Sequence, residues 1–226
     1  MKNRLTIAIQ KGERMSEPAV GMLGRAGIKI EKSPRRLVAE KGDIKLAFLR
    51  GPDIPCLLDE GVVDAAIIGS NEIEEAYLEN PARRKYLLDN IPLGISPARI
   101  SLAGPLKRKT DYDLSDAKAI ATSYPNIARE YLLRSGIIGL SRNRRTTRPF
   151  VNVIFLSGAV EAAPELGMAD YIIDIVESGG TLAENGLAEF DKIMDTQGVL
   201  VSRRLEAYQA AIFRRIKEAL EDVGQR

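Results

Sequence analysis

Short apolar runs of strand length alternate along this chain with longer amphipathic stretches, and this alternation limits its possible folds more than any other feature. The runs expected as strands are residues 5–9, 44–49, 63–69, 99–103, 117–121, 151–155 and 171–176. The stretches expected as helices are residues 17–26, a short one from 53, 72–78, 126–135 and 159–166. Strands separated by helices predict βαβ units, and therefore an α/β fold with mostly parallel sheets covered on both faces.

The chain has 226 residues, enough for one large domain or two small lobes. Pro92, Gly94 and Pro97 lie between two apolar runs, so a second lobe is expected to begin near residue 95. The last segment, residues 203–225, places apolar side chains on one helical face. That face is expected to dock on its own lobe, with a partner-binding helix as the alternative.

Two absences narrow the chemistry. There is no histidine, which excludes Ser-His-Asp and Cys-His catalysis and every His-ligated metal site, so acid-base work falls to carboxylates, Lys or Tyr. The single cysteine, Cys56, cannot form an internal disulfide and is interpreted as a packing residue.

Charge and hydropathy bear on partners and location. The formal net charge is +2 with both signs mixed along the chain, so neither nucleic acid nor membrane is expected as a partner. No stretch has the length of a signal-peptide core or of a membrane span, which predicts a reducing cytoplasm as the location.

A small-residue loop follows the expected strand at 171–176. Ser178, Gly179 and Gly180 allow the backbone to approach a ligand closely and to direct N–H groups at an anion. Thr181 is expected to cap the following helix in a capping box with Glu184. The loop therefore predicts a phosphate site, against the alternative of an ordinary strand-turn-helix.

Two carboxylates, Asp174 and Glu177, precede this loop. They lie where the adjacent hydroxyls of a phosphorylated ribose would sit, and carboxylates accept hydroxyl hydrogen bonds and favour positive charge on a ribose ring. An acidic strand end before a phosphate loop is the chemistry of a 5-phosphoribosyl diphosphate site.

From residue 5 to about 203 the chain resembles the ATP phosphoribosyltransferase family. The segments that carry the resemblance are Gln10-Lys11 with Arg14, Leu49-Arg50 with Asp53-Ile54-Pro55, Glu60-Gly61-Val62-Val63-Asp64, Ile67-Ile68-Gly69, Ala121-Thr122-Ser123-Tyr124-Pro125, Ser157-Gly158-Ala159-Val160-Glu161 with Ala163-Pro164, and residues 174–181 with Glu184-Asn185-Gly186-Leu187. The resemblance implies two α/β lobes like a periplasmic binding protein, with the active site in the interlobe cleft. Lobe I would hold residues 1–95 plus about 188–226, and lobe II residues 96–187.

The implied activity is that of a glycosyltransferase, specifically a pentosyltransferase. Adenine N1 of ATP would attack C1 of 5-phosphoribosyl diphosphate with the help of Mg²⁺, giving N1-(5-phosphoribosyl)-ATP and pyrophosphate in the first step of histidine biosynthesis. The metal would arrive on the substrate, and no protein ligand to it is predicted. The competing interpretations are a non-catalytic two-lobed binding protein for a phosphorylated ligand and a phosphoribosyltransferase for another base.

The resemblance also implies residue roles. Expected at the 5-phosphoribosyl diphosphate are Asp174, Glu177, Ser178, Gly179, Gly180, Thr181 and Leu182. Expected at the ATP polyphosphate and its surroundings are Lys11, Arg14, Arg50, Arg99 and Tyr124, and expected in catalysis are Asp174, Glu161 and Arg50. Three alternatives stay open: Arg50 pairs with a local carboxylate, Glu161 only stabilises a helix start, and Tyr124 only packs.

The chain stops where longer family members continue into a histidine-binding domain, so it resembles the short form. The expected partners are further copies of the chain and a regulatory subunit resembling histidyl-tRNA synthetase, with weak or no inhibition of the isolated chain by histidine. The basic run 142–148 is interpreted as a solvated loop, with a patch for an acidic partner or nucleic acid as the alternative.

Overall fold

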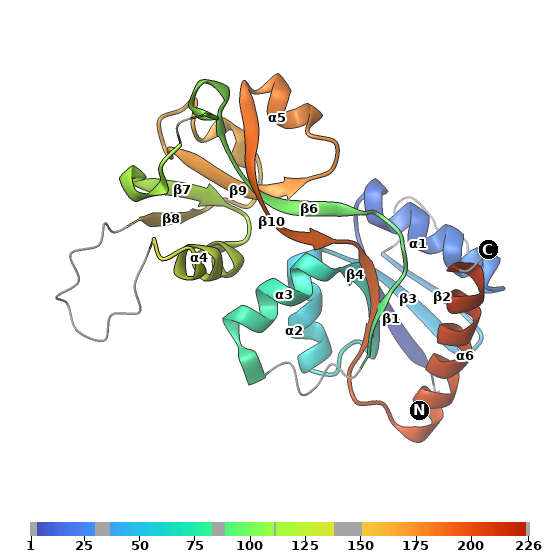
Figure 1. Ribbon diagram of the computed structural model, residues 1–226. Coiled ribbons are helices and arrows are strands. Elements are labelled where there is room, and N and C mark those ends of the chain that lie inside the picture. The colour runs from blue at the N-terminus through green and yellow to red at the C-terminus, as the bar shows by residue number, and fades with distance from the viewer. Residues whose placement is uncertain (1–3, 30–36, 83–88, 111, 138–150, 225–226) are drawn as a thin grey trace. The chain divides into compact units, whose positions relative to one another are not determined.

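The computed structural model describes residues 4–29, 37–82, 89–110, 112–137 and 151–224, and the basic run 142–148 lies outside them. The chain divides into two compact units, each built on one sheet (Figure 1). Unit 1 comprises Met1–Pro97 and Gln197–Arg226, and unit 2 comprises Ala98–Thr196. The return to the first unit was expected near residue 188, but the strand that ends at Thr196 still pairs within unit 2.

The unit 1 sheet has the strand order β2-β3-β1-β4-β11-β5. The strands are β1 (Leu5–Gln10), β2 (Val38–Lys41), β3 (Ile44–Leu49), β4 (Ala65–Gly69), β5 (Asp89–Pro92) and β11 (Gly198–Ser202). β1 runs parallel to both β3 and β4, whereas β2 is antiparallel to β3 and β11 is antiparallel to β4 and β5.

Strand alternation in unit 1 produces two apolar faces, because successive side chains point to opposite sides of a sheet. The helices are α1 (Glu13–Arg25), α2 (Ile54–Asp59), α3 (Ser70–Glu79) and α6 (Ala207–Gly224), with a 3₁₀ turn, η1 (Gly51–Asp53), before α2. Ile7 and Ile67 pack in one cluster with α1 and α6, and Ala8 and Ile68 pack in another with α2 and α3. The expectation that the last helix docks on its own lobe is confirmed by the burial of Ile216 in the first cluster.

The unit 2 sheet has the strand order β10-β6-β9-β7-β8. The strands are β6 (Ala98–Pro105), β7 (Ala119–Thr122), β8 (Asn152–Phe155), β9 (Tyr171–Val176) and β10 (Leu187–Thr196). β7 runs parallel to β8 and β9, and β6 runs antiparallel to β9 and β10. The expectation of mostly parallel sheets is therefore wrong: both sheets are mixed. In unit 2 the reason is that the chain enters along β6 and leaves along β10, which lie side by side in opposite directions.

Unit 2 has few regular helical turns. Its helical segments are α4 (Pro125–Arg134), α5 (Gly180–Glu184), η3 (Leu106–Arg108), η4 (Leu114–Asp116) and η5 (Val160–Ala162). The helix expected over 159–166 is thus only a 3₁₀ turn followed by turns, because Ala159 before it is left-handed at φ 50° and Pro164 removes a backbone donor.

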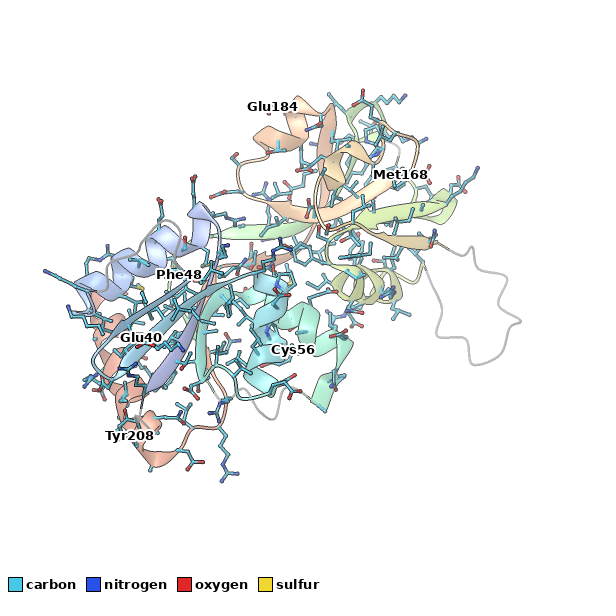
Figure 2. The ribbon with its side chains drawn as sticks, turned by 180° about the vertical axis from the view of Figure 1, so that it is seen from behind. Glu40, Phe48, Cys56, Met168, Glu184 and Tyr208 are labelled. Carbon is cyan, nitrogen blue, oxygen red and sulfur yellow. The ribbon has the colours of Figure 1, made fainter. Side chains whose placement is uncertain are left out.

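The structure also tests the predictions for the single cysteine and for membrane-spanning helices. Cys56 is exposed on α2 (Figure 2), since that helix buries Ile54, Pro55 and Leu58 on its other side, so its interpretation as a packing residue is wrong. Among the described helices, none combines the length and the apolar composition needed to cross a membrane.

Gly104 in β6 allows two aromatic rings to pack on the strand, and we predict that Gly104→Ala destabilises the protein. An added Cβ would lie 2.7 Å from Cδ1 of Tyr171 and 2.9 Å from Cε2 of Phe190, so the rings must shift. Overpacking of this kind costs about 1–3 kcal/mol in the free energy of unfolding. Urea unfolding followed by circular dichroism measures it. Gly24→Ala is the control, because its Cβ would meet nothing within 4 Å and helix α1 favours alanine; an equal loss in both variants would contradict the prediction.

Candidate active site

Three loops of unit 2 follow the carboxyl ends of strands that run in the same direction. β9 leads into the small-residue loop and α5, β7 leads into α4, and β8 leads into η5. The hydroxyl of Ser123 after β7 donates to the Leu156 carbonyl after β8 over 2.8 Å, which joins two of these loops. Ligands of open α/β sheets bind beyond the carboxyl ends of parallel strands, so this edge of unit 2 is the candidate site.

The small-residue loop turns at Gly179. Its φ of 84° lies in the left-handed region, which glycine adopts without strain, and it forms the N-cap of α5. The N–H of Gly180 is 3.4 Å from Oγ of Ser178. The predicted capping box is wrong: no side chain caps α5, and Thr181 and Glu184 both lie inside the helix. The first backbone N–H groups of α5 have no partner within the helix, which leaves donors for an anion at this loop.

Leu182 contributes its backbone only. Its side chain is buried in the unit 2 core with Ala103, Ile172 and Val176. A role in ligand binding is therefore restricted to its N–H group, and its side chain anchors α5 to the sheet.

The structure brings Asp174 and Glu161 together. Asp174 lies near the end of β9 and Glu161 lies in η5, which packs on that strand. The pKa of Asp174 is raised from 3.8 to about 6, mainly by burial; a backbone hydrogen bond at Ile175 opposes this shift, and the charge of Glu161 makes a smaller contribution that also raises the pKa. The two carboxylates thus interact electrostatically, at the edge where the sequence predicted a ribose.

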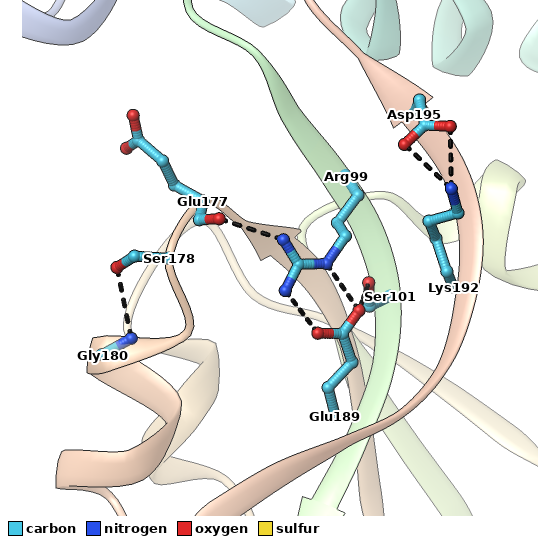
Figure 3. A network of polar contacts seen from close by, with 8 residues as sticks. All are labelled: Arg99, Ser101, Glu177, Ser178, Gly180, Glu189, Lys192 and Asp195. Atoms are coloured by element: carbon cyan, nitrogen blue, oxygen red, sulfur yellow. Dashed lines mark hydrogen bonds and ion pairs between the residues drawn. The ribbon is translucent and has the colours of Figure 1, made fainter.

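Arg99 has protein partners on both sides of its guanidinium (Figure 3). Its Nε donates to Oε1 of Glu189 over 2.6 Å and one Nη donates to Oε2 of the same carboxylate. The other Nη donates to the Glu177 carbonyl over 3.0 Å, and the hydroxyl of Ser101 donates to Glu189 over 2.8 Å. The hydrogen bond from Arg99 lowers the pKa of Glu189, and the same contact raises the pKa of Arg99.

Tyr124 is the N-cap residue of α4 and is 9% exposed. Its N–H donates to Oγ1 of Thr122 over 2.8 Å. The low exposure agrees with the packing alternative for this side chain, and its place at the ATP stays a prediction.

Unit 1 gathers a second set of predicted residues at the carboxyl ends of β1, β3 and β4. Oε1 of Gln10 accepts from the Gly69 N–H over 2.8 Å, and the Lys11 N–H donates to the Leu49 carbonyl over 2.7 Å. Lys11 and Arg50 are both exposed, and Arg50 forms no ion pair with a carboxylate of the described residues. The local-carboxylate alternative for Arg50 therefore lacks support.

Arg14 is tied to unit 1 through Ser96. Pro18 in α1 has no N–H to donate to the Arg14 carbonyl, and the Ser96 hydroxyl donates to that carbonyl instead. One Nη of Arg14 donates to the Ser96 carbonyl over 3.3 Å. Sequence reasoning missed Ser96, because its partner lies 82 positions away.

Glu72 is a buried carboxyl that sequence reasoning also missed. It lies in the first turn of α3 and is 8% exposed. A Cβ placed on Gly51 would be 2.9 Å from both Oε1 of Glu72 and Nε2 of Gln10, so Gly51 permits this close packing beside Arg50. Burial, followed by the charge of Glu75, raises the pKa of Glu72 from 4.5 to about 7.

The comparisons with known proteins point to one family. The family model HisG, ATP phosphoribosyltransferase, matches residues 50–223. A solved chain of the ATP phosphoribosyl transferase (HisG:HisZ) complex from Thermotoga maritima shares 27% sequence identity, with a TM-score of 0.73, and the match covers 96% of this chain and 99% of that one.

More distant structures are similar in fold alone. YhfZ from Shigella flexneri has 19% identity and a TM-score of 0.60, over 99% of this chain and 89% of that chain. A histidine kinase sensor domain with similarity to periplasmic binding proteins has 13% identity and a TM-score of 0.58, and the match covers 98% of this chain and 92% of that chain. The periplasmic-binding-protein-like fold is thereby confirmed.

We predict that Glu72→Gln stabilises the protein increasingly as pH rises. The folded state binds the Glu72 proton more tightly than the unfolded state, so the stability associated with the protonated form is full below pH 4.5 and is lost as pH rises through about 7. The difference between variant and wild type should grow by up to about 3 kcal/mol between pH 5 and 8. Urea unfolding across that range measures it. Glu79→Gln, an exposed position on the same helix, is the control; a pH-independent difference for Glu72→Gln would contradict the prediction.

Proposed function

The chain belongs to the ATP phosphoribosyltransferase family, which catalyses the first step of histidine biosynthesis, and we propose that its 5-phosphoribosyl diphosphate site is the carboxyl edge of the unit 2 sheet. The observation that carries this proposal is that Asp174, Glu161 and the loop at Gly179 all lie at the carboxyl ends of the parallel strands β8 and β9. In the proposed reaction adenine N1 of ATP attacks C1 of the ribose, the C1–oxygen bond breaks, and pyrophosphate leaves.

The ribose 5-phosphate is assigned to the backbone of residues 178–182. Gly179 turns the chain without strain, and no side-chain Cβ at either glycine narrows the approach of an anion. Thr181 is exposed and adds a hydroxyl donor. Leu182 supplies an N–H group from a helix turn that its buried side chain holds in place.

Asp174 is assigned to the ribose hydroxyls. A carboxylate accepts two hydroxyl hydrogen bonds, and its charge stabilises the cationic character that develops on the ring during ribosyl transfer. With a pKa of about 6, Asp174 is ionised in most molecules at pH 7, so this stabilisation is lost as pH falls through 6. Glu161 is assigned to the adenine 6-amino group, and Glu177 flanks the ribose.

The exposed cations of unit 1 are assigned to ATP. Lys11 and Arg50 lie beyond the carboxyl ends of β1 and β3, where side chains reach a ligand at the sheet edge. A guanidinium binds phosphate oxygens in a bidentate manner, which suits Arg50 for the triphosphate. Arg14, in the first turn of α1 after Lys11, is assigned to the same substrate, and its guanidinium also donates to the Ser96 carbonyl.

Magnesium is assigned to the substrate. Among the described residues no group of three or more acidic side chains could hold a metal ion, and Mg²⁺ is commonly bound through substrate phosphates with several waters retained, so the oxygens of the diphosphate would hold it. When bound, the ion neutralises charge on the leaving pyrophosphate. The protein side chains hold the two substrates in a reactive orientation, which is the larger part of the work in a transfer of this kind.

The proposal extends to a regulatory subunit as partner and to the cytoplasm as the compartment. The similar chain from Thermotoga maritima is part of a HisG:HisZ complex, and we propose that this chain assembles with a HisZ-type regulatory subunit. ATP and 5-phosphoribosyl diphosphate are substrates of the cell interior, which supports the cytoplasm as the place of action.

The first test is incubation of the purified chain with ATP, 5-phosphoribosyl diphosphate, Mg²⁺ and pyrophosphatase, followed by mass spectrometry. The expected result is a phosphoribosyl-ATP adduct that requires both substrates and the metal. Repeating the assay with a HisZ-type subunit separates an obligatory partner from an inactive chain. Saturable binding of 5-phosphoribosyl diphosphate with no adduct in either assay would favour the binding-protein alternative.

We predict that Asp174→Asn lowers kcat by about 10²-fold or more while the dissociation constant for 5-phosphoribosyl diphosphate changes less than tenfold. The amide still bonds the ribose hydroxyls, but it lacks the charge that stabilises the transition state. Steady-state kinetics and direct titration measure the two effects. Asp43→Asn is the control, since this carboxylate pairs with Arg215 of α6 and lies directly before β3, at the opposite end of that strand from Arg50; unchanged turnover in Asp174→Asn would remove Asp174 from the mechanism.

A further inference from the structure

The guanidinium of Arg99, a residue of β6, binds residues that belong to the two neighbouring strands of unit 2 or directly follow one of them (Figure 3). β6, which carries Arg99, lies between β10, which carries Glu189, and β9, which leads into Glu177. In the register of β6 and β9, Arg99 is opposite Val176, the residue before Glu177. From this position in β6, the Arg99 side chain reaches the backbone of Glu177, the first residue after β9.

The contact with Glu177 is to the backbone. One Nη of Arg99 donates to the Glu177 carbonyl over 3.0 Å. A peptide unit is planar, and no described peptide bond is cis, so the Glu177 carbonyl and the Ser178 N–H point in opposite directions. The hydrogen bond holds the Glu177 carbonyl toward Arg99. The Ser178 N–H must therefore point away from Arg99, toward the small-residue loop.

The carboxylate of Glu189 holds Arg99 in this position. It binds the guanidinium through two oxygens, with Nε to Oε1 at 2.6 Å, and it accepts a further hydrogen bond from Ser101 at 2.8 Å. Bidentate pairs of this type have a defined geometry, so the guanidinium plane is fixed. The pair is also formally neutral, which leaves Arg99 without the unpaired charge expected of a direct polyphosphate ligand.

The same network adjoins the proposed ribose-binding carboxylate. Ser101 is opposite Asp174 in the register of β6 and β9, so the two side chains lie on one face of the sheet. One set of strand contacts therefore fixes both the Ser178 peptide and the strand position of Asp174.

We propose that Arg99, oriented by Glu189, is a positioning residue for the phosphate loop and not a ligand of ATP. It fixes the peptide between Glu177 and Ser178 so that the Ser178 N–H faces the 5-phosphate group of the substrate. This inference rests on the proposed function of the loop, and it replaces the role that sequence analysis gave to Arg99.

The test is a double-mutant cycle with Arg99→Gln, Glu189→Gln and the double variant, in which each substrate is titrated separately by calorimetry. Arg99→Gln is expected to weaken binding of 5-phosphoribosyl diphosphate tenfold or more and to leave the dissociation constant of ATP within twofold. Glu189→Gln should act in the same direction with a smaller effect. The double variant should be no weaker than Arg99→Gln, because the two residues act as one unit.

Two variants separate positioning from general stability. Arg99→Lys retains one donor for the Glu177 carbonyl but loses the fork that binds Glu189, so it should recover part of the affinity. Arg134→Gln removes an exposed ion pair with Glu130 on α4 of the same unit and should leave both affinities unchanged. Should Arg99→Gln fail to fold, Arg99→Lys and Glu189→Gln carry the same comparison.

Several results would overturn the inference. Weaker ATP binding with unchanged 5-phosphoribosyl diphosphate binding would make Arg99 an ATP ligand, and unchanged binding of both substrates would remove its positioning role. The amide NMR signal of Ser178 in the ligand-free protein should shift in Arg99→Gln, and an unshifted signal would also contradict the inference. Absence of 5-phosphoribosyl diphosphate binding in the wild type would overturn the proposed function of the loop, while the Ser178 signal would still test the contact itself.

Discussion

The parallel pairing of β7 with β8 and β9 is the constraint on which the candidate site of unit 2 depends. Parallel strands end at one edge, so the loop at Gly179, the turn with Glu161 and the start of α4 come together although they are far apart in the sequence. The antiparallel strands β6 and β10 then provide a fixed flank, from which Arg99 and Glu189 reach that edge. The parallel strands thus bring the three loops to one edge, and a side chain of the antiparallel pair binds the backbone of the loop that follows β9.

Each unit keeps a carboxyl whose pKa is raised mainly by burial, yet the two serve different ends. Asp174, with a pKa of about 6, is ionised in most molecules at neutral pH and so keeps the negative charge that its proposed role at the ribose requires. Glu72, with a pKa of about 7, is protonated in about half of the molecules there and packs against Gly51, directly after Arg50. Burial of Glu72 therefore limits negative charge beside a cation that is proposed to bind phosphate.

The sequence could predict what depends on neighbouring residues. The strand at Tyr171–Val176 has the expected bounds, and the turn at Gly179 follows from glycine in a small-residue run. Contacts between residues far apart in the sequence could not be predicted in this way. The partners of Arg99 and Arg14 lie 90 and 82 positions away, and neither Glu189 nor Ser96 has a local pattern that marks it. The mixed sheets were missed for the same reason, because strand direction is set by the path of the whole chain.

The resemblance to a family predicted Arg99 at the ATP, but a resemblance of sequence cannot give the role of a side chain, for a physical reason. Similarity preserves the position of a side chain on a strand, whereas its role depends on whether its charge is compensated. Glu189 compensates the charge of Arg99, and the remaining donor binds a carbonyl. Arg50 forms no ion pair with a carboxylate of the described residues, which agrees with its proposed role as a phosphate ligand. A chain without histidine can in this way divide its arginines between binding polyanions and shaping the backbone that binds them, because ribosyl transfer requires orientation and charge more than proton transfer.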